Sequence, residues 1–345
     1  MQRQSIFKII SILLGVLLSL LLAEVAYRIY HFASYSDMKD IRAGKRNPVV
    51  SPDEAVKLGE IILLSIHRNI VYELIPSSKY RFQGALVETN SNGFKDREYP
   101  KSKQKRTFRI VGLGDSVMFG WGVGEADCYL TKLEDKLNEQ DSKSVEVINS
   151  AVPGYNTVME VATFAHKFEL ETVDMVIINF VGNDLDLPNF IRKKPAYFGI
   201  KKSFILQRFE ENDGNDRNLQ EAPFNEAITA YQRDADKVPP EYRHLVGEES
   251  YNAAMKELAQ LQTKYGFKVI VLSTDPMGEY PTFVKRTCEN LGFELLEIWP
   301  YWQKYKSDNP NAVWVLSNSD GHPSAVGHSV IAVALQDKMA RNKAH

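Results

Sequence analysis

From residue 107 onward, short apolar runs alternate with segments of helical periodicity, and this alternation limits the fold more than any other feature of the chain. The apolar runs occupy 108–113, 145–152, 174–181, 268–273 and 293–299, and the helical patterns occupy about 125–139, 156–170, 249–265, 280–291 and 324–341. Strands separated by helices form parallel sheets, because the chain must run back along the sheet between two parallel strands, and a helix usually makes that connection. We therefore expect an α/β domain, a three-layer α/β/α sandwich with a parallel sheet.

The N-terminal segment has a different character. The apolar stretch from Ile6 to Ala26 admits only Lys8 and Glu24 near its ends. At 1.5 Å per residue it is roughly 31 Å long, enough to cross a bilayer as a helix. A retained transmembrane helix over residues 1–30 is the prediction, and a cleaved signal peptide is the alternative. Because long domains translocate largely regardless of charge, we expect the domain that begins at residue 107 to be extracytoplasmic.

Between these parts, residues 31–106 are polar and interrupted by prolines, which predicts a juxtamembrane or cap segment. Within it, residues 54–73 are expected to be helical, and the turn-forming run Asn90–Tyr99 is expected to form a hairpin or cap beside the α/β domain. The remainder, 107–345, is the predicted α/β domain.

An insertion at about 185–247 breaks the alternation of that domain. It contains an aromatic and basic piece, Tyr197 to Arg208, and a polar run, Glu210 to Asn218. A segment of this length is either a lid that sets specificity or a surface loop, and both interpretations remain open.

Composition narrows the function classes. The formal net charge is −2, which argues against a protein that binds nucleic acid through a basic surface. The two cysteines are Cys128 and Cys288. We expect them to be free thiols, and a disulfide between them is the alternative. No cluster with metal-ligand spacing is evident, and no His-Glu-x-x-His occurs, so no metal site is predicted.

The run Gly114-Asp115-Ser116 follows the apolar stretch that ends at Leu113. A serine at the end of a buried parallel strand lies at the sheet edge where ligands collect. Its hydroxyl is a poor nucleophile until a base takes the proton, so Ser116 needs partners. The alternative role is a cap for the following helix.

Three further pieces supply those partners. Gly154, in Asn149–Tyr155, has a backbone N–H that a reacting group can approach closely. Asn183 follows the most apolar run and has an amide that can donate to an oxyanion. His322 and Asp320, near the last helical pattern, offer a base and its orienting carboxylate. His328 falls inside that helical pattern and is expected to be a packing or capping residue.

These four blocks resemble the SGNH (GDSL) hydrolase family, over roughly residues 107–340. The resemblance implies a flavodoxin-like fold and an ester-hydrolysing site that needs no metal or organic cofactor. By it, Ser116 is the nucleophile, His322 the base and Asp320 its partner, with the Ser116 N–H, the Gly154 N–H and the Asn183 side chain as oxyanion hole. The family commonly has aspartate three residues before the histidine, whereas Asp320 lies only two before.

The function so implied is hydrolysis of a short acyl ester, such as an acetyl ester, through an acyl-serine intermediate. The run Asn90–Tyr99 also resembles the leader of membrane-anchored bacterial members associated with cell-surface polysaccharide, so a polysaccharide ester is one expected substrate. Transfer of the acyl group to a sugar hydroxyl, and carbohydrate binding without catalysis, are the alternatives.

Overall fold

The computed structural model describes residues 2–34, 37–42, 55–140, 144–193, 203, 205–206, 218–222, 224–225, 230–274 and 282–343. At its centre lies a five-stranded parallel sheet with the order β14-β13-β8-β6-β7. Its strands are β6 (Phe108–Leu113), β7 (Val145–Asn149), β8 (Met175–Phe180), β13 (Lys268–Ser273) and β14 (Glu294–Glu297). Each coincides with one of the apolar runs, so the parallel sheet predicted from them is confirmed.

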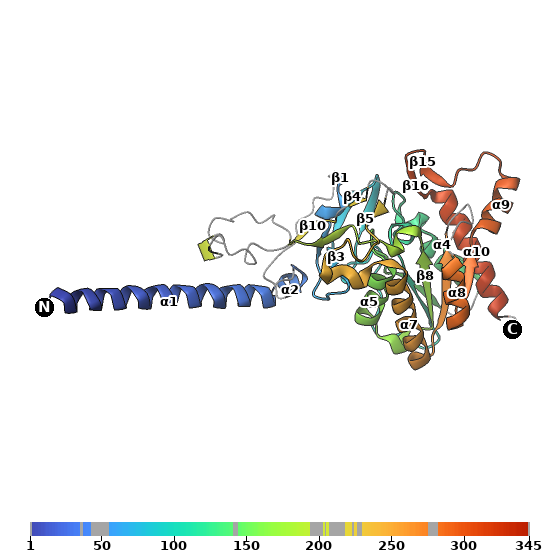
Figure 1. Ribbon diagram of the computed structural model, residues 1–345. Coiled ribbons are helices and arrows are strands. Elements are labelled where there is room, and N and C mark those ends of the chain that lie inside the picture. Colours follow the sequence, from blue (N-terminus) through green and yellow to red (C-terminus); the bar gives the residue numbers. More distant parts are fainter. Residues whose placement is uncertain are drawn as a thin grey trace.

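Helices cover both faces of the sheet (Figure 1). One face packs against α5 (Thr157–Lys167), α7 (Gly247–Tyr265) and α8 (Thr282–Leu291). The other packs against α4 (Tyr129–Gln140), α9 (Trp299–Asp308) and α10 (Ala325–Lys343). Side chains of β8 alternate between the two cores, as they must on a pleated strand. This is the expected three-layer sandwich.

The strand order reverses between β6 and β8, because β6 pairs with β7 on one side and with β8 on the other. In chain order this arrangement is 2-1-3-4-5, the flavodoxin-like topology, in which ligands bind at the reversal point. Ser116 follows β6 and Asn183 follows β8, so two predicted site residues lie at that point.

The N-terminal segment contributes short strands rather than the helix predicted over 54–73, and that prediction is wrong for the described residues 55–73. The run Ile61–Ser65 is buried at every position, so it has no exposed face of the kind a surface helix shows. The strands are β1 (Ala55–Val56), β2 (Ile62–Leu64), β3 (Tyr72–Leu74), β4 (Lys79–Phe82) and β5 (Ala85–Glu88).

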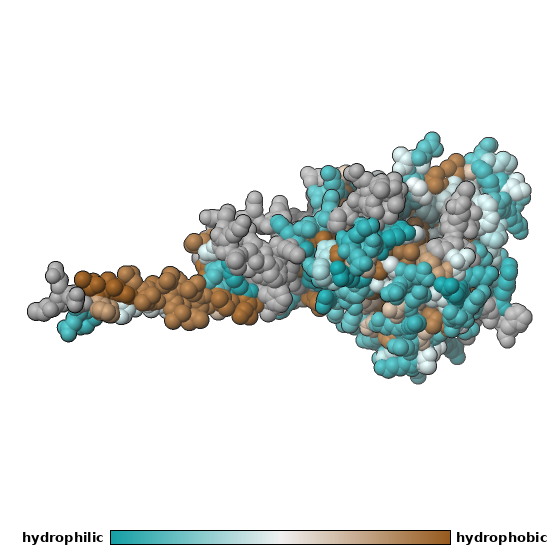
Figure 2. Space-filling view, in the orientation of Figure 1, coloured by the Kyte–Doolittle hydropathy of each residue, from teal (hydrophilic) through white to brown (hydrophobic). Residues whose placement is uncertain are grey.

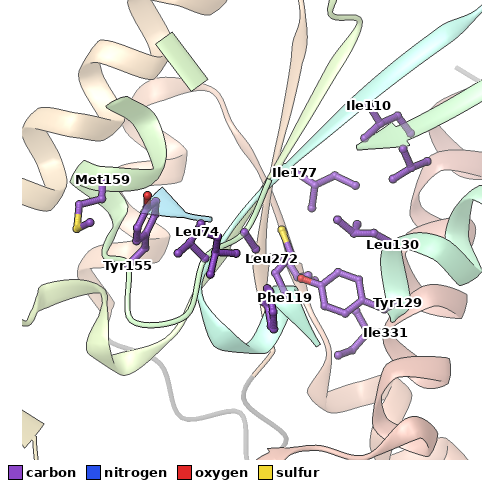
Figure 3. Packing of buried hydrophobic residues seen from close by; sticks show 14 of the residues in the cluster. Leu74, Ile110, Phe119, Tyr129, Leu130, Tyr155, Met159, Ile177, Leu272 and Ile331 are labelled. Atoms are coloured by element: carbon purple, nitrogen blue, oxygen red, sulfur yellow. The ribbon is translucent and has the colours of Figure 1, made fainter. Parts of the chain in front are cut away.

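These strands share the core of the sheet domain. Leu74 of β3 lies among Tyr155, Phe119 and Leu272 in one buried cluster (Figure 3). Residues 90–99 contain turns and no strand, and they lie against the same domain through Lys95, Asp96 and Tyr99.

The helix α1 (Gln2–Ser34) projects away from the rest of the protein (Figure 1). In the described part of the chain, one stretch is long and apolar enough to cross a membrane, Ile6–Tyr30, and its side chains make a continuous apolar surface (Figure 2). The next helix, α2 (Asp37–Arg42), packs against the domain. Met38 is buried, and an Asp37 oxygen accepts the Leu64 N–H at 3.1 Å.

Several elements were not expected. Helix α9 and the hairpin of β15 (Val315–Ser317) and β16 (Asp320–Pro323) occupy a stretch for which no element was predicted. The smaller elements are α3 (Ser116–Phe119), the 3-10 turns η1 (Leu58–Glu60), η2 (Glu125–Asp127), η3 (Leu170–Thr172), η4 (Gly182–Leu185) and η7 (Pro240–Leu245), and strands β9 (Phe190–Arg192), β10 (Leu219–Glu221), β11 (Phe224–Asn225) and β12 (Ala230–Tyr231).

Strands β9 to β12 lie in the 185–247 insertion, most of whose aromatic-basic piece and polar run falls outside the described residues. Elsewhere, Cys128 and Cys288 are both buried free thiols, as expected.

Candidate active site

The nucleophile candidate sits at the first position of α3, directly after β6. The cap of this helix is Asp115, not Ser116: the Asp115 carboxylate accepts the Val117 N–H at 2.9 Å. The alternative role considered for Ser116, a helix cap, is therefore filled by its neighbour. The Ser116 hydroxyl remains half-exposed and lies 2.8 Å from Nε2 of His322 and 3.3 Å from an Asp115 oxygen.

His322 reaches Ser116 from the β15–β16 hairpin, 206 residues along the chain. Its other ring nitrogen, Nδ1, lies 2.7 Å from Oδ1 of Asp320, which also accepts the His322 backbone N–H at 3.1 Å. An ionised carboxylate only accepts hydrogen bonds, so Nδ1 carries the proton. Nε2 then has a free lone pair, directed at the Ser116 hydroxyl.

The spacing of two residues between Asp320 and His322 thus still brings the carboxylate to the ring. Burial alone would raise the pKa of Asp320, but hydrogen bonds from the side chain and backbone of His322, and from Trp121, outweigh it and hold the pKa below its usual range. Asp320 consequently stays charged at neutral pH and keeps His322 in the tautomer that can accept a proton from serine.

Trp121 is a site residue that the sequence analysis missed. Its indole N–H donates to Oδ2 of Asp320 at 3.1 Å, and its ring stacks on His322 with centroids 4.8 Å apart. The residue stands between Gly120 and Gly122, whose φ angles are +78° and +74°. A tryptophan between two glycines directly after the nucleophile helix is a signal of a tight turn that presents an aromatic ring to the site.

Two backbone N–H groups are available for an oxyanion. Neither the Ser116 N–H nor the Gly154 N–H donates to an acceptor within the described residues. Gly154 has a φ of +77°, and a Cβ there would come within 2.4 Å of Cγ of Asn189. Only glycine therefore fits this turn, on both conformational and steric grounds.

The third predicted donor, Asn183, lies beside the nucleophile but is already engaged. Its amide donates to Oδ2 of Asp115 at 2.9 Å and to the Tyr155 carbonyl at 3.4 Å. Asp115 thus connects the nucleophile turn to the turn that carries Asn183. The long second bond is the weaker of the two.

The segment before residue 107 holds two of these turns. The Tyr72 hydroxyl donates to the Pro153 carbonyl at 2.9 Å, and the Tyr155 hydroxyl donates to the Tyr72 carbonyl. Strand β3 is therefore hydrogen-bonded to the residues on both sides of Gly154. The buried Lys95 ammonium donates to the carbonyls of Gly120 and Val123, at 3.0 and 2.8 Å, on both sides of Trp121.

Buried acids lie beneath the site. Burial, followed by repulsion from neighbouring carboxylates, raises the pKa of Glu160 and of Asp184 well above the usual range. Asp184 accepts the Val181 N–H at 2.6 Å and the Thr157 hydroxyl at 2.9 Å. Among the described residues, no group of three or more His, Cys, Asp or Glu side chains could hold a metal ion.

His328 lies away from the nucleophile, inside α10 as expected. It is fully buried, stacks on Tyr129 with centroids 5.5 Å apart, and accepts the Tyr129 backbone N–H at 3.2 Å. Its role is to pack α10 against α4.

No family model matches this chain, and no curated protein matches it. Solved structures that are similar to it include a putative lipolytic protein of the G-D-S-L family from Desulfitobacterium hafniense, with 13% identity over 66% of this chain and 98% of that one and a TM-score of 0.40. An acetylxylan esterase from Geobacillus stearothermophilus has 14% identity over 68% and 96%, with a TM-score of 0.41. A lipase/acylhydrolase from Enterococcus faecalis has 15% identity over 68% and 96%, with a TM-score of 0.39.

One of these neighbours is described as a G-D-S-L family protein, and the other two as an esterase and a lipase/acylhydrolase. At such identities and TM-scores, the chemistry of this chain has to be inferred from its own side chains.

Proposed function

We propose that this protein is a serine esterase of the SGNH type that hydrolyses an acyl ester through an acyl-serine intermediate. The observation that carries the proposal is the connected series Ser116 Oγ, His322 Nε2, His322 Nδ1 and Asp320 Oδ1, with contacts of 2.8 and 2.7 Å. A nucleophile bonded to a base, which is bonded to an orienting carboxylate, is the arrangement that activates serine for acyl transfer.

In the first half-reaction, Nε2 of His322 takes the Ser116 proton while Oγ attacks the ester carbonyl carbon. The carbonyl electron pair moves onto oxygen and forms a tetrahedral oxyanion. When this collapses, the bond from carbon to the alcohol oxygen breaks, and the proton on Nε2 passes to the departing alcohol. Water then repeats the sequence on the acyl-serine, with His322 again as base, and releases the acid.

The oxyanion in this proposal is held by the Ser116 and Gly154 N–H groups and by Asn183. Asn183 would exchange its long bond to the Tyr155 carbonyl, at 3.4 Å, for a bond to the oxyanion, which carries more charge. Each such donor contributes on the order of 3 kcal/mol of transition-state stabilisation.

The acyl group is proposed to be small. The support is the packing of the Asn189 side chain against Gly154, close enough that even a Cβ on that glycine would overlap it. An ester series from acetyl to dodecanoyl tests this: kcat/KM should be highest for the two- to four-carbon esters, and a maximum at long chains would contradict it.

Replacement of the nucleophile gives the decisive test. The variant Ser116→Ala should lose at least roughly 10⁴-fold in kcat on p-nitrophenyl acetate, because no other group can form the acyl intermediate. A fluorophosphonate should label the wild-type chain on the peptide that contains Ser116, and should leave that peptide unmodified in the variant.

Ser319→Ala is the matched control, since this exposed serine lies in the same hairpin as the base and its hydroxyl bonds only to Ser317 among the described residues. It should turn over the ester like the wild type. Hydrolysis by folded Ser116→Ala at the wild-type rate would remove Ser116 from the mechanism.

A further inference from the structure

We propose that Trp121 is a positioning residue for the catalytic base: its indole N–H holds Asp320, and its ring face supports His322. The inference deepens the proposed esterase function and rests on it. Trp121 is half-buried and reaches across from the turn after α3 to the β15–β16 hairpin, so it connects the nucleophile side of the site to the base side.

The bonding of Asp320 shows why such a residue is needed. Oδ1 accepts two hydrogen bonds from His322, one from the backbone N–H and one from Nδ1, and both come from within the same short turn. The terminal torsion of an aspartate is broad, and these two bonds restrain it only as far as the short turn itself keeps its shape. The Trp121 N–H on Oδ2 is the bond from outside the turn, and it fixes the plane of the carboxylate.

The ring of Trp121 has a second effect. It lies nearly parallel to the imidazole of His322, with an interplanar angle of 11° and centroids 4.8 Å apart. During the reaction His322 becomes an imidazolium, and a cation over an aromatic face is stabilised by the ring quadrupole. The stack therefore favours the charged state of the base that exists only in the transition state and the intermediates.

Trp121 is itself held firmly. Phe82 of β4 meets its ring edge-on with centroids 4.9 Å apart, and Lys95 binds the carbonyls of Gly120 and Val123 on either side of it. Because the backbone on both sides of Trp121 is held in place, its hydrogen bond and its ring contact can hold Asp320 and His322 in place. A rigid supporting shell of this kind is what keeps catalytic side chains in productive geometry.

The variant Trp121→Phe tests the hydrogen bond, since phenylalanine retains an aromatic face but has no N–H. We expect kcat to fall roughly tenfold, the size of the loss of one hydrogen bond to a charged group, with KM changed less than twofold. In an Asp320→Ala background the same replacement should have almost no further effect, because Trp121 acts through Asp320 and the two losses are not additive.

A second variant guards against a packing defect: benzothienylalanine at position 121 keeps the indole shape and replaces the N–H with sulfur. It should reproduce the fall in kcat without lowering the melting temperature. Trp299→Phe, at another partly buried tryptophan that packs against the core, is the control and should leave kcat unchanged. Wild-type kcat in both Trp121 variants, or equal losses with and without Asp320, would overturn the inference.

One readout does not depend on turnover. The proton between Nδ1 of His322 and Asp320 should give a far-downfield NMR resonance in the resting protein, and exchange with water should broaden it in the Trp121 variants. If the wild type hydrolyses no ester but the resonance responds in this way, the positioning role stands and the esterase proposal fails. If the ester is hydrolysed and the resonance is unaffected, the reverse holds.

Discussion

At the residue scale, the two histidines of the C-terminal motif have opposite surroundings and opposite roles. His322 is half-exposed and directed at Ser116, whereas His328 is buried. Burial, reinforced by the positive charges of Lys95 and Lys132, lowers the pKa of His328 to about 3. Its Nδ1 accepts the Tyr129 N–H, and its Nε2 is buried without a partner in the described part of the chain. The residue is thus held neutral in the folded protein.

Because His328 is neutral in the folded protein, the free energy of unfolding should depend on pH. Unfolding frees His328 to bind a proton near its ordinary pKa of 6.5, whereas the folded state binds it only near pH 3. Between these values the unfolded state carries the extra proton, so the free energy of unfolding should fall by about 1.4 kcal/mol for each unit of acidification. The variant His328→Asn keeps an acceptor for the Tyr129 N–H but does not titrate. Urea unfolding between pH 4 and 7 should show a shallower acid slope for the variant, and identical slopes would contradict the assignment.

Single residues also mark the limit of sequence reasoning. Ser116, Gly154, Asn183 and His322 could be proposed as site residues from the sequence, because each follows or precedes a recognisable element in a recognisable order. The roles of Asp115 and Trp121 could not, because they depend on which atoms face each other after folding. The carboxylate of Asp115 could cap a helix or approach the nucleophile, and the sequence does not distinguish these uses; in the structure it does both.

At the element scale, the sheet and its helices were predictable because buried parallel strands are apolar throughout and the helices between them are amphipathic. The N-terminal strands were not predicted, because β1 to β5 are only two to four residues long, and even the alternation of buried and exposed positions in β4 and β5 covers just four residues. Their pairing depends on contacts with the domain that follows, which is information that local pattern does not contain. Helix α9 was not predicted, although Pro300 lies in its first turn, a position to which proline is well suited.

The turn between α3 and η2 depends on one buried cation from the segment at 90–99. Replacing Lys95 with methionine keeps most of the volume but leaves the carbonyls of Gly120 and Val123 without their donor. The free energy of unfolding should fall by roughly 2–4 kcal/mol, the cost of two unsatisfied buried acceptors. Chemical denaturation measures this loss. Lys105→Met, at an exposed position, is the control and should unfold like the wild type.

At the scale of the whole molecule, the apolar helix α1 lies outside the core of the domain, and its Glu24 accepts hydrogen bonds from Ser203 and from the Ile205 N–H of the insertion. We propose that α1 is a membrane anchor, since its apolar side chains are exposed while the domain has a closed core of its own. A chain shortened to begin at residue 35 should therefore fold, hydrolyse the ester and stay in the aqueous phase on detergent partitioning. The full chain should enter the detergent phase. Aqueous partitioning of the full, uncleaved chain would contradict the anchor.

The next segment is not separable in this way. Tyr72, Phe82 and Lys95 all lie before residue 100, and each contacts a turn that carries a site residue. A chain beginning at residue 100 should fail to give a cooperative unfolding transition, because removal of the preceding segment exposes buried side chains of the shared core. A folded, active product would show that the N-terminal strands are a dispensable cover.

Synthesis proceeds from the amino end, so a growing polypeptide acquires Ser116 long before it acquires His322, 206 residues later. During that interval, in the mechanism proposed above, the Ser116 hydroxyl lacks the base that would take its proton. Catalytic competence in this architecture is therefore a property of the finished and folded chain, and esterase activity measures completion as well as chemistry.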